Sequence, residues 1–203
     1  MRIFAIGRNY QDHVAELKNE KPKAPVVFTK PDTAILKNNA PFYYPEFTKN
    51  IHHEVEVIIR ICKEGKSIDE KFASKYYDAI GIGIDFTARD LQDELKKEGL
   101  PWDIAKGFNG SAPISEWVDI SEVSDVNNIV FSLKKNDKLV QQGTTADMNF
   151  SIAQIISYIS IYFTLRKGDI IYTGTPSGVS SIAIGDRLVA YLGDKEMLNF
   201  EIK

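Results

Sequence analysis

The sequence has little of what marks exported, membrane-spanning or nucleic-acid-binding proteins. It has a single cysteine, Cys62, in 203 residues, so no disulfide forms within the chain and we expect a reducing compartment. No apolar run approaches the roughly 20 residues of a membrane helix, and Met1–Gly7 is too short and too soon interrupted for a signal peptide. The formal net charge of -3 gives no attraction to nucleic acid or to an anionic membrane. These absences predict a cytoplasmic enzyme or binding protein.

What is present is an ordinary globular composition, with 43% hydrophobic and 26% charged residues. The length suits one domain with a sizeable core, and no repeat, low-complexity tract or interior linker divides it. Many short strand patterns, few helical ones and no regular βαβ alternation predict an α+β fold dominated by a curled mixed sheet. We expect residues 1–50 to form an appendage on that body, with the charged, proline-containing segment 18–25 as a lid.

Two strand patterns carry the acids of greatest interest. The stretch 53–60 alternates, with Val55, Val57 and Ile59 on one parity and Glu54 and Glu56 on the other. Residues two apart in a strand point to the same face, about 6–7 Å apart. A second apolar strand, 79–86, carries Asp85 near its end. Three carboxylates converging on one point favour a cation between them, and an all-oxygen set suits Mg²⁺, Mn²⁺ or Ca²⁺ rather than zinc. The alternative is a half-exposed strand whose glutamates face water.

The spacing of apolar residues and the positions of turn residues predict the longer helices and strands around these acids. We expect a hairpin over 128–142 and a helix over 87–99 that ends at a glycine. The segment 150–165 has the strongest helical pattern and should pack against the sheet. A further helix is predicted over 67–77, with Ser67 as its cap.

Six collinear stretches resemble the fumarylacetoacetate hydrolase family and together cover nearly the whole chain. They are Gly7-Arg8-Asn9-Tyr10 with His13 and Glu16, Phe28-Thr29-Lys30-Pro31, His53-Glu54-Val55-Glu56, Asp85-Phe86-Thr87-Ala88-Arg89-Asp90, Lys106-Gly107-Phe108, and Gly174-Thr175-Pro176-Ser177-Gly178-Val179. The pattern of Arg8 with His13 and Glu16 is most similar to the acylpyruvase and oxaloacetate decarboxylase branch. The resemblance implies a β-rich roll, a homodimer, and the family's catalytic body without the extra N-terminal domain that some members carry.

By position, the resemblance makes Glu54, Glu56 and Asp85 the ligands of Mg²⁺ or Mn²⁺, with Ca²⁺ as a substitute in crystals. Two residues depart from the family pattern. Asn109 stands where many relatives have aspartate, and Ser180 stands where glycine is frequent. Neither is a proposed ligand, and both bear on the identity of the substrate.

Within this resemblance we predict hydrolytic C–C cleavage of acylpyruvates through the enolate of pyruvate. The metal would stabilise the charge on the keto oxygen more in the transition state than in the ground state. His13, oriented by Glu16, would take a proton from the water that attacks the distal carbonyl, and Lys106 would stabilise the oxyanion. Decarboxylation of oxaloacetate passes through the same enolate, so one site could serve both reactions. The remaining candidates bind substrate: Arg89, Gln92 and Thr175 would orient it, and Arg8 or Lys30 would hold its carboxylate.

Two other functions fit the same residues. An isomerase, tautomerase or hydratase acting on 2-oxo dienoic acids or oxaloacetate would use the same chemistry without breaking a C–C bond. A non-catalytic metal-binding module would need only the acids. Single residues also have structural interpretations, since His13 and Glu16 could be an exposed helical pair and Lys106 a surface lysine. We interpret His52 and His53 as structural, because His53 has the opposite parity from the glutamates.

Overall fold

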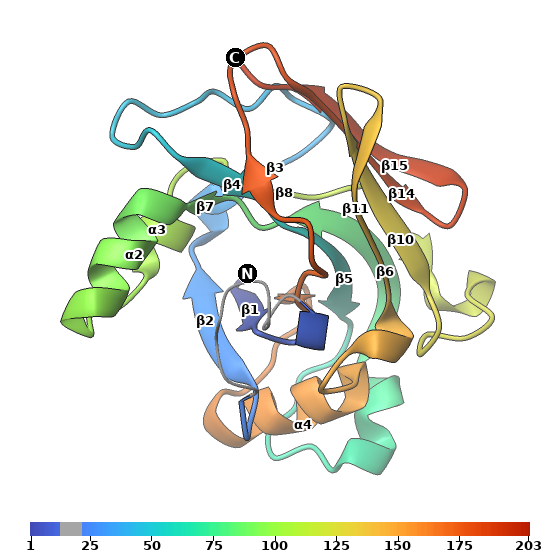
Figure 1. Cartoon of the computed structure of the whole chain (residues 1–203). Helices are drawn as coiled ribbons and strands as arrows, with labels where there is room; N and C mark the ends of the chain where they lie inside the picture. The colour runs from blue at the N-terminus through green and yellow to red at the C-terminus, as the bar shows by residue number, and fades with distance from the viewer. Residues whose placement is uncertain (13–21) are drawn as a thin grey trace.

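A curled six-stranded sheet forms the body of the protein, seen in a computed structural model that describes residues 1–12 and 22–203 (Figure 1). The strands lie in the order β2-β1-β12-β5-β6-β9. β1 runs parallel to β12, and the other neighbouring pairs are antiparallel, so the sheet is mixed as predicted. The strands are β1 Ile3–Gly7, β2 Val26–Lys30, β5 Val55–Ile61, β6 Tyr77–Ile84, β9 Val118–Asp119 and β12 Ile170–Tyr172.

The two central strands are buried on both faces. Only Arg60 in β5 and Asp78 in β6 are not buried. Val57 belongs to the larger apolar core, whereas Ile58, on the opposite parity, belongs to a second apolar cluster. The half-exposed strand considered above is therefore wrong, and Glu56 is only 1% exposed.

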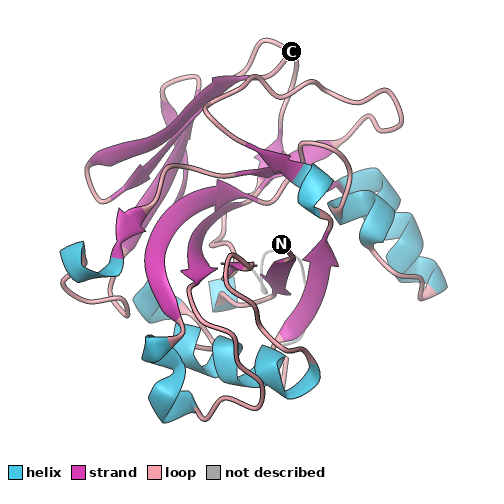
Figure 2. Ribbon diagram, turned by 180° about the vertical axis from the view of Figure 1, so that it is seen from behind, coloured by secondary structure: helices cyan, strands magenta, loops and turns pink. Residues whose placement is uncertain are grey.

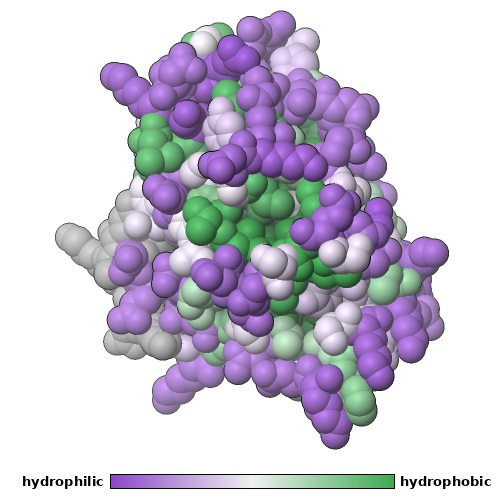
Figure 3. Space-filling view, turned by 90° about the vertical axis from the view of Figure 1, so that its right-hand side faces the viewer, coloured by the Kyte–Doolittle hydropathy of each residue, from purple (hydrophilic) through white to green (hydrophobic). Residues whose placement is uncertain are grey.

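A four-stranded sheet, in the order β11-β10-β14-β15, packs its apolar side chains against β5 and β6. The predicted hairpin is confirmed as β10–β11. Its turn residues Asn136 and Asp137 have φ of 51° and 64°, as a two-residue hairpin turn that matches strand twist requires. The face on this side of the molecule is hydrophilic at its edges, with hydrophobic side chains gathered at its centre (Figure 3). The strands are β10 Val130–Lys135, β11 Lys138–Thr144, β14 Arg187–Leu192 and β15 Lys195–Glu201.

Two small sheets join distant parts of the chain. β4 (Ile51–His53) lies between β13 (Ser180–Ser181) and β7 (Thr87–Ala88). β3 (Ile35–Leu36) pairs in parallel with β8 (Ala112–Pro113). In the β13-β4-β7 sheet, β4 directly precedes Glu54, and its neighbour β7 directly precedes the helix that begins at Arg89.

The α-helices α2 (Arg89–Glu98) and α3 (Asp103–Lys106) lie along one flank of the curled sheet, and α4 (Ile152–Tyr162) lies at one of its ends (Figure 1 and Figure 2). α2 ends at Gly99, which has a left-handed φ of 69°, and α4 begins with a capping box at Ser151. Both confirm predicted helices, whereas α3 is a single turn where no helix was expected. Within the described residues, no helix is long and apolar enough to cross a membrane. The 3-10 helices are η1 Asp32–Ala34, η2 Glu70–Lys75, η3 Ile120–Glu122 and η4 Thr145–Asp147.

Residues 1–50 do not form the appendage expected from the sequence. β1 lies inside the six-stranded sheet, between β2 and β12, and its residues 3–6 are at most 2% exposed. The pairing that places β1 there joins residues at opposite ends of the chain, so no local pattern signals it. The segment 18–25, expected to act as a lid, lies partly outside the described residues, because residues 18–21 are not among them.

The helix predicted over 67–77 is confirmed only in part. The segment contains only the short η2, capped by Asp69, whose carboxylate accepts from the N–H of Lys71 at 3.2 Å. Ser67 has a φ of 50°, which is incompatible with the extended backbone of a helix cap. The capping residue is therefore two positions later than predicted.

Candidate metal and active site

Three buried acids meet where β4, β5 and β6 come together. Glu54 lies between β4 and β5, Glu56 is within β5, and Asp85 directly follows β6. The antiparallel register of these strands lets the N–H of Asp85 donate to the carbonyl of Glu54 at 2.8 Å. One carboxylate oxygen from each acid lies within 4.8 Å of the others, and the residues are 5%, 1% and 1% exposed. The structure thus brings together the acids that the sequence singled out.

Three cationic side chains surround these acids. Lys106 Nζ lies 2.8 Å from Glu54 Oε2 and 2.7 Å from Asp85 Oδ2. Lys30 Nζ lies 2.7 Å from Asp85 Oδ1, and Arg89 donates through Nη2 to Glu54 Oε1. All three cations are buried, so the surface-lysine interpretation of Lys106 is wrong. These cations are tolerated in the interior because each lies close to Glu54, Asp85 or both.

Glu56 has the least nearby positive charge of the three acids. Its Oε2 accepts a hydrogen bond from the N–H of Gly174 at 2.6 Å, and within the described part of the chain it forms no ion pair. Burial, assisted by the charges of Asp85 and Glu54, raises the pKa of Glu56 well above its usual value. A divalent cation would supply the positive charge that this all-oxygen donor set lacks. The residues therefore fit Mg²⁺, Mn²⁺ or Ca²⁺.

The pKa values of Lys30 and Lys106 are shifted in opposite directions. Burial disfavours the charged form of Lys106, but the adjacent Asp85 and Glu54 outweigh it, and the pKa of Lys106 is raised. For Lys30 burial prevails over the attraction of Asp85, and its pKa is lowered. Lys106 is therefore the more firmly protonated of the two.

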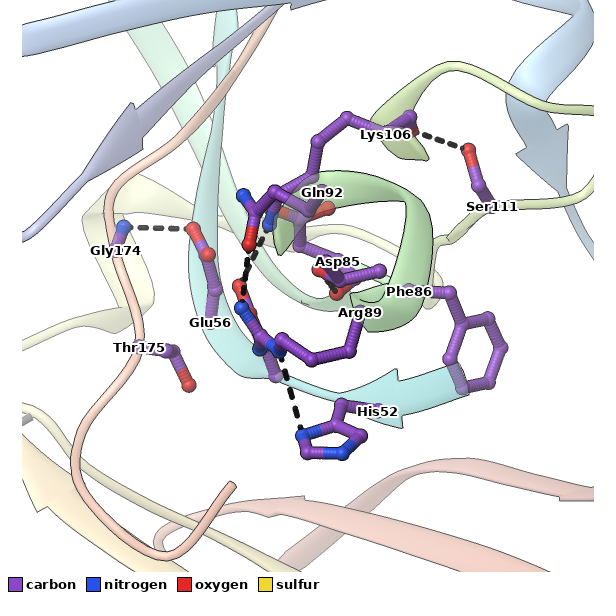
Figure 4. A network of polar contacts seen from close by, with 12 residues as sticks. His52, Glu56, Asp85, Phe86, Arg89, Gln92, Lys106, Ser111, Gly174 and Thr175 are labelled. Atoms are coloured by element: carbon purple, nitrogen blue, oxygen red, sulfur yellow. Dashed lines mark hydrogen bonds and ion pairs between the residues drawn. The ribbon is translucent and has the colours of Figure 1, made fainter. Parts of the chain in front are cut away.

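Arg89, the first residue of α2, connects the acids to two further polar side chains (Figure 4). Its Nη1 donates to Gln92 Oε1 at 2.6 Å, and its Nε points to Nδ1 of His52 at 3.4 Å. Gln92 is three residues further along α2, so the two side chains share one helix face. Burial and then the charge of Arg89 lower the pKa of His52 to about 4. Because Oε1 of Gln92 accepts from arginine, its NH₂ group is left to donate to a ligand.

The motif at 7–10 is fastened to the loop after β12. The side-chain NH₂ of Asn9 donates to the carbonyl of Thr173 at 2.7 Å. Gly174 has a φ of +106°, and a Cβ there would lie 2.6 Å from the Cβ of Asn9, so only glycine fits. Arg8 has a φ of 61°, which is uncommon for a residue with a side chain. The chain turns sharply at Arg8 to reach the site.

Most of the candidate residues line one small cavity. It has a volume of about 30 Å³, enough for an ion or a water molecule. Lys30 does not line it, because its amine lies behind Asp85 and donates to the carbonyl of Ser111 at 2.8 Å. His13 and Glu16 lie outside the described residues. The cavity is lined by the acids and by Arg8, Arg89, Gln92, Lys106 and Thr175.

Two polar residues near the site had no sequence signal. Ser111 supports both lysines, since it accepts from Lys30 and its Oγ donates to the carbonyl of Lys106 at 2.7 Å. Gln141 in β11 donates to Thr175 Oγ1 at 2.9 Å. A serine in a loop and a glutamine in a strand are too common to single out. His53 is buried with Gln141 as a partner, as expected for a structural residue.

Comparison with known proteins identifies relatives along the whole chain. The family described as Fumarylacetoacetate (FAA) hydrolase C-terminal matches residues 2–203. A Bos taurus protein named oxaloacetate tautomerase FAHD1, mitochondrial, is 41% identical over 201 residues, which cover 99% of this chain and 91% of that protein. The Arabidopsis thaliana protein of the same name is 38% identical over 202 residues, covering 100% of this chain and 91% of its own.

Solved structures agree with the predicted α+β fold. A putative fumarylacetoacetate hydrolase family protein from Yersinia pestis has a TM-score of 0.96 at 38% identity, covering 100% of this chain and 93% of that one. Fumarylpyruvate hydrolase from Pseudomonas aeruginosa, in complex with Mn²⁺ and pyruvate, has a TM-score of 0.95 at 31% identity and covers 100% and 89%. Both the family model and these relatives confirm the resemblance drawn from the six motifs, and the chain belongs to the fumarylacetoacetate hydrolase family.

Proposed function

We propose that this family enzyme is divalent-metal-dependent and interconverts the keto and enol forms of oxaloacetate. The observation that carries the proposal is the meeting of Glu54, Glu56 and Asp85 with a buried lysine and a buried arginine around one cavity. The names of the relatives from Bos taurus and Arabidopsis thaliana support oxaloacetate as the substrate. Keto–enol exchange moves a proton between C3 and the C2 oxygen and breaks no bond between heavy atoms. It therefore requires no water nucleophile.

The acids would hold the metal. A divalent ion bound by Glu54, Glu56 and Asp85 would act as a Lewis acid for negative charge on the keto oxygen of a 2-oxo acid. Lys106 now bridges two of these acids, and it would turn its ammonium group toward the substrate oxygen. In the position it occupies here, Asp85 and Glu54 raise its pKa, and a protonated Lys106 at the substrate would stabilise the charge that develops on oxygen.

The substrate carboxylates have donors on α2. Arg89 supplies a fixed positive charge, and Gln92 supplies the NH₂ group that arginine leaves available. Arg8 and Thr175 also line the cavity and would contact a substrate bound to the metal there. Lys30, which lies 2.7 Å from Asp85 Oδ1, would hold that carboxylate in place rather than touch the substrate.

Hydrolysis of acylpyruvates is the second candidate. It is favoured by the name of the Pseudomonas aeruginosa relative, fumarylpyruvate hydrolase, and by His13 and Glu16 in the sequence. It needs a base to activate water, for which His13 oriented by Glu16 is the candidate. A metal-binding module without catalysis is the third, and it leaves the buried Lys106 and Arg89 without a role.

One pair of assays separates these functions. Purified protein with Mn²⁺ or Mg²⁺ should accelerate the loss of the ultraviolet absorbance of enol-oxaloacetate without releasing pyruvate. Pyruvate released from acetylpyruvate, and lost in His13→Ala, would support the hydrolase instead. No turnover in either assay, despite bound metal, would leave only the binding module.

We also infer that the protein works as a homodimer. Phe47, Ile104 and Phe163 are 53%, 62% and 41% exposed and line one hollow of about 1130 Å³. Large apolar side chains gathered around one hollow are typical of interaction surfaces, and a second copy of the chain would cover them. Sedimentation equilibrium should give twice the chain mass of 22.9 kDa; a monomer at micromolar concentration would contradict the inference.

A cytoplasmic location stays a prediction for this chain. The Bos taurus and Arabidopsis thaliana relatives carry the word mitochondrial in their names. Cell fractionation with an antibody to the protein distinguishes the two locations.

A further inference from the structure

A buried side chain from the four-stranded sheet holds the loop that faces the acids. Gln141 in β11 is 2% exposed. Its Nε2 donates to Thr175 Oγ1 at 2.9 Å and to the carbonyl of Pro176 at 3.0 Å. Its Oε1 accepts from the N–H of Val55, the residue between the two glutamates, at 3.1 Å. Gln141 therefore joins the loop to β5, the strand that contains Glu56.

Backbone groups fix the direction of every hydrogen bond in this network. The N–H of Val55 can only donate and the carbonyl of Pro176 can only accept, so the amide of Gln141 has one orientation. Its Oε1 also faces His53 Nδ1 at 2.9 Å, so Nδ1 carries the hydrogen. The other ring nitrogen, Nε2, then accepts from Ser180 Oγ at 2.7 Å. Each partner in the chain thus has one role.

The same loop orients Glu56. Thr175 Oγ1 donates to the carbonyl of Val55 at 2.8 Å, and the preceding residue, Gly174, donates its N–H to Glu56 Oε2 at 2.6 Å. A displacement of Thr175 therefore moves the donor that holds this carboxylate. Among these hydrogen bonds of Thr175 and Gly174, the one from Gln141 comes from the four-stranded sheet.

We propose that Gln141 is a positioning residue for the metal site. Oriented by His53, it fixes Thr175, and through it the Gly174 N–H that aims Glu56 into the cavity. The proposal rests on the proposed function only in that Glu56 binds a divalent ion. Loss of outer partners of metal ligands typically lowers metal affinity about 10–100-fold. We expect about tenfold, the low end of that range, because Gln141 acts through two further residues.

The test replaces the side-chain NH₂ group of Gln141 by an oxygen. Gln141→Glu keeps the shape but puts an oxygen where the NH₂ donates to Thr175 and Pro176. Gln142→Glu is the matched control, since Gln142 is the next residue of β11, is exposed, and makes no side-chain hydrogen bond to the described residues. Titration calorimetry with Mn²⁺ should show about tenfold weaker binding for Gln141→Glu and unchanged binding for Gln142→Glu. Oxaloacetate kinetics should show the loss mainly in kcat at saturating metal, because the substrate donors of α2 are intact.

The outcomes separate this proposal from the function proposed above. Mn²⁺ affinity within twofold of the wild type in folded Gln141→Glu overturns it, even if thermal unfolding in EDTA shows lower stability. If Gln141→Glu does not fold, Gln141→Asn, which keeps the amide but shortens its reach, is judged by the same affinity. Wild type that binds Mn²⁺ without acting on oxaloacetate refutes only the reaction. Wild type that binds no Mn²⁺ refutes both.

Discussion

Glu56→Gln should change from a stabilising to a destabilising substitution when a divalent ion is added. Glutamine keeps the shape, and its Oε1 can still accept from Gly174. One oxygen of each acid lies within 4.8 Å of the others, and two unit charges at about that distance repel by about 3 kcal/mol at an effective dielectric constant of about 20. Glu56 has two such neighbours, Asp85 and Glu54, and the attraction of Lys106 offsets part of the repulsion. Without metal, we expect the variant to be more stable than wild type by about 1 kcal/mol.

Metal should reverse that order. An ion at about 100 times its Kd adds about 2.7 kcal/mol to the wild type. If loss of one of three acids weakens binding about 100-fold, the variant gains only about 0.4 kcal/mol at the same concentration. The difference between these gains exceeds the advantage that the variant has without metal.

Urea unfolding at pH 7, followed by far-ultraviolet circular dichroism in EDTA and in Mn²⁺, measures both effects. Glu122→Gln, at an exposed acid in η3, is the control and should match the wild type in both buffers. A variant that is less stable than wild type in EDTA would refute the repulsion argument. A variant that gains as much from Mn²⁺ as wild type would show that Glu56 is not a ligand.

Three further predictions concern stability and turnover. Burial lowers the pKa of His53 to about 4 from 6.5, so the unfolded state binds more protons between these values and stability falls as pH drops through this range. From pH 7 to pH 5 the unfolding free energy in EDTA should fall by about 2 kcal/mol more in wild type than in His53→Asn; equal slopes would contradict this. Gly83→Ala would place a Cβ 2.5 Å from Tyr172 Cε1 and should cost about 1–3 kcal/mol in urea unfolding, whereas an unchanged midpoint would mean that the ring moves freely. Arg89→Lys cannot reach both Gln92 and Glu54 and should lower kcat/KM at least about tenfold; wild-type kinetics would show that charge alone suffices.

The acids could be predicted from the sequence because their signal is local. Glu54 and Glu56 are two apart in a strand pattern, and Asp85 ends the next apolar strand along the chain. β5, which follows Glu54, then pairs antiparallel with β6, which precedes Asp85. Strands that are consecutive in the chain often pair in this way. Two of the cations, Lys30 and Lys106, were accessible only through the motifs of the family.

Gln141 and the place of β1 could not be predicted, since their partners are distant. Gln141 meets Val55 across 86 positions of sequence and Thr175 across 34. The parallel pairing of Ile3 with Ile170 spans most of the chain. Such contacts leave no periodic trace, because each depends on the whole sheet having formed. The misplaced start of the helix predicted over 67–77 has a different cause, because Ser67 has a φ of 50° in place of the extended backbone of a cap.

The insertion of β12 between β1 and β5 has a consequence for how the protein is made. A ribosome must release residues 170–172 before the hairpin β1–β2 and the pair β5–β6 can join into one sheet. Contacts this remote in sequence slow folding, because a long loop must close before they form. Gly174 leaves the ribosome still later, so the carboxylate cluster gains its backbone donor only at the end of synthesis. In the nascent chain the three acids are therefore synthesised well before the Gly174 N–H that donates to Glu56.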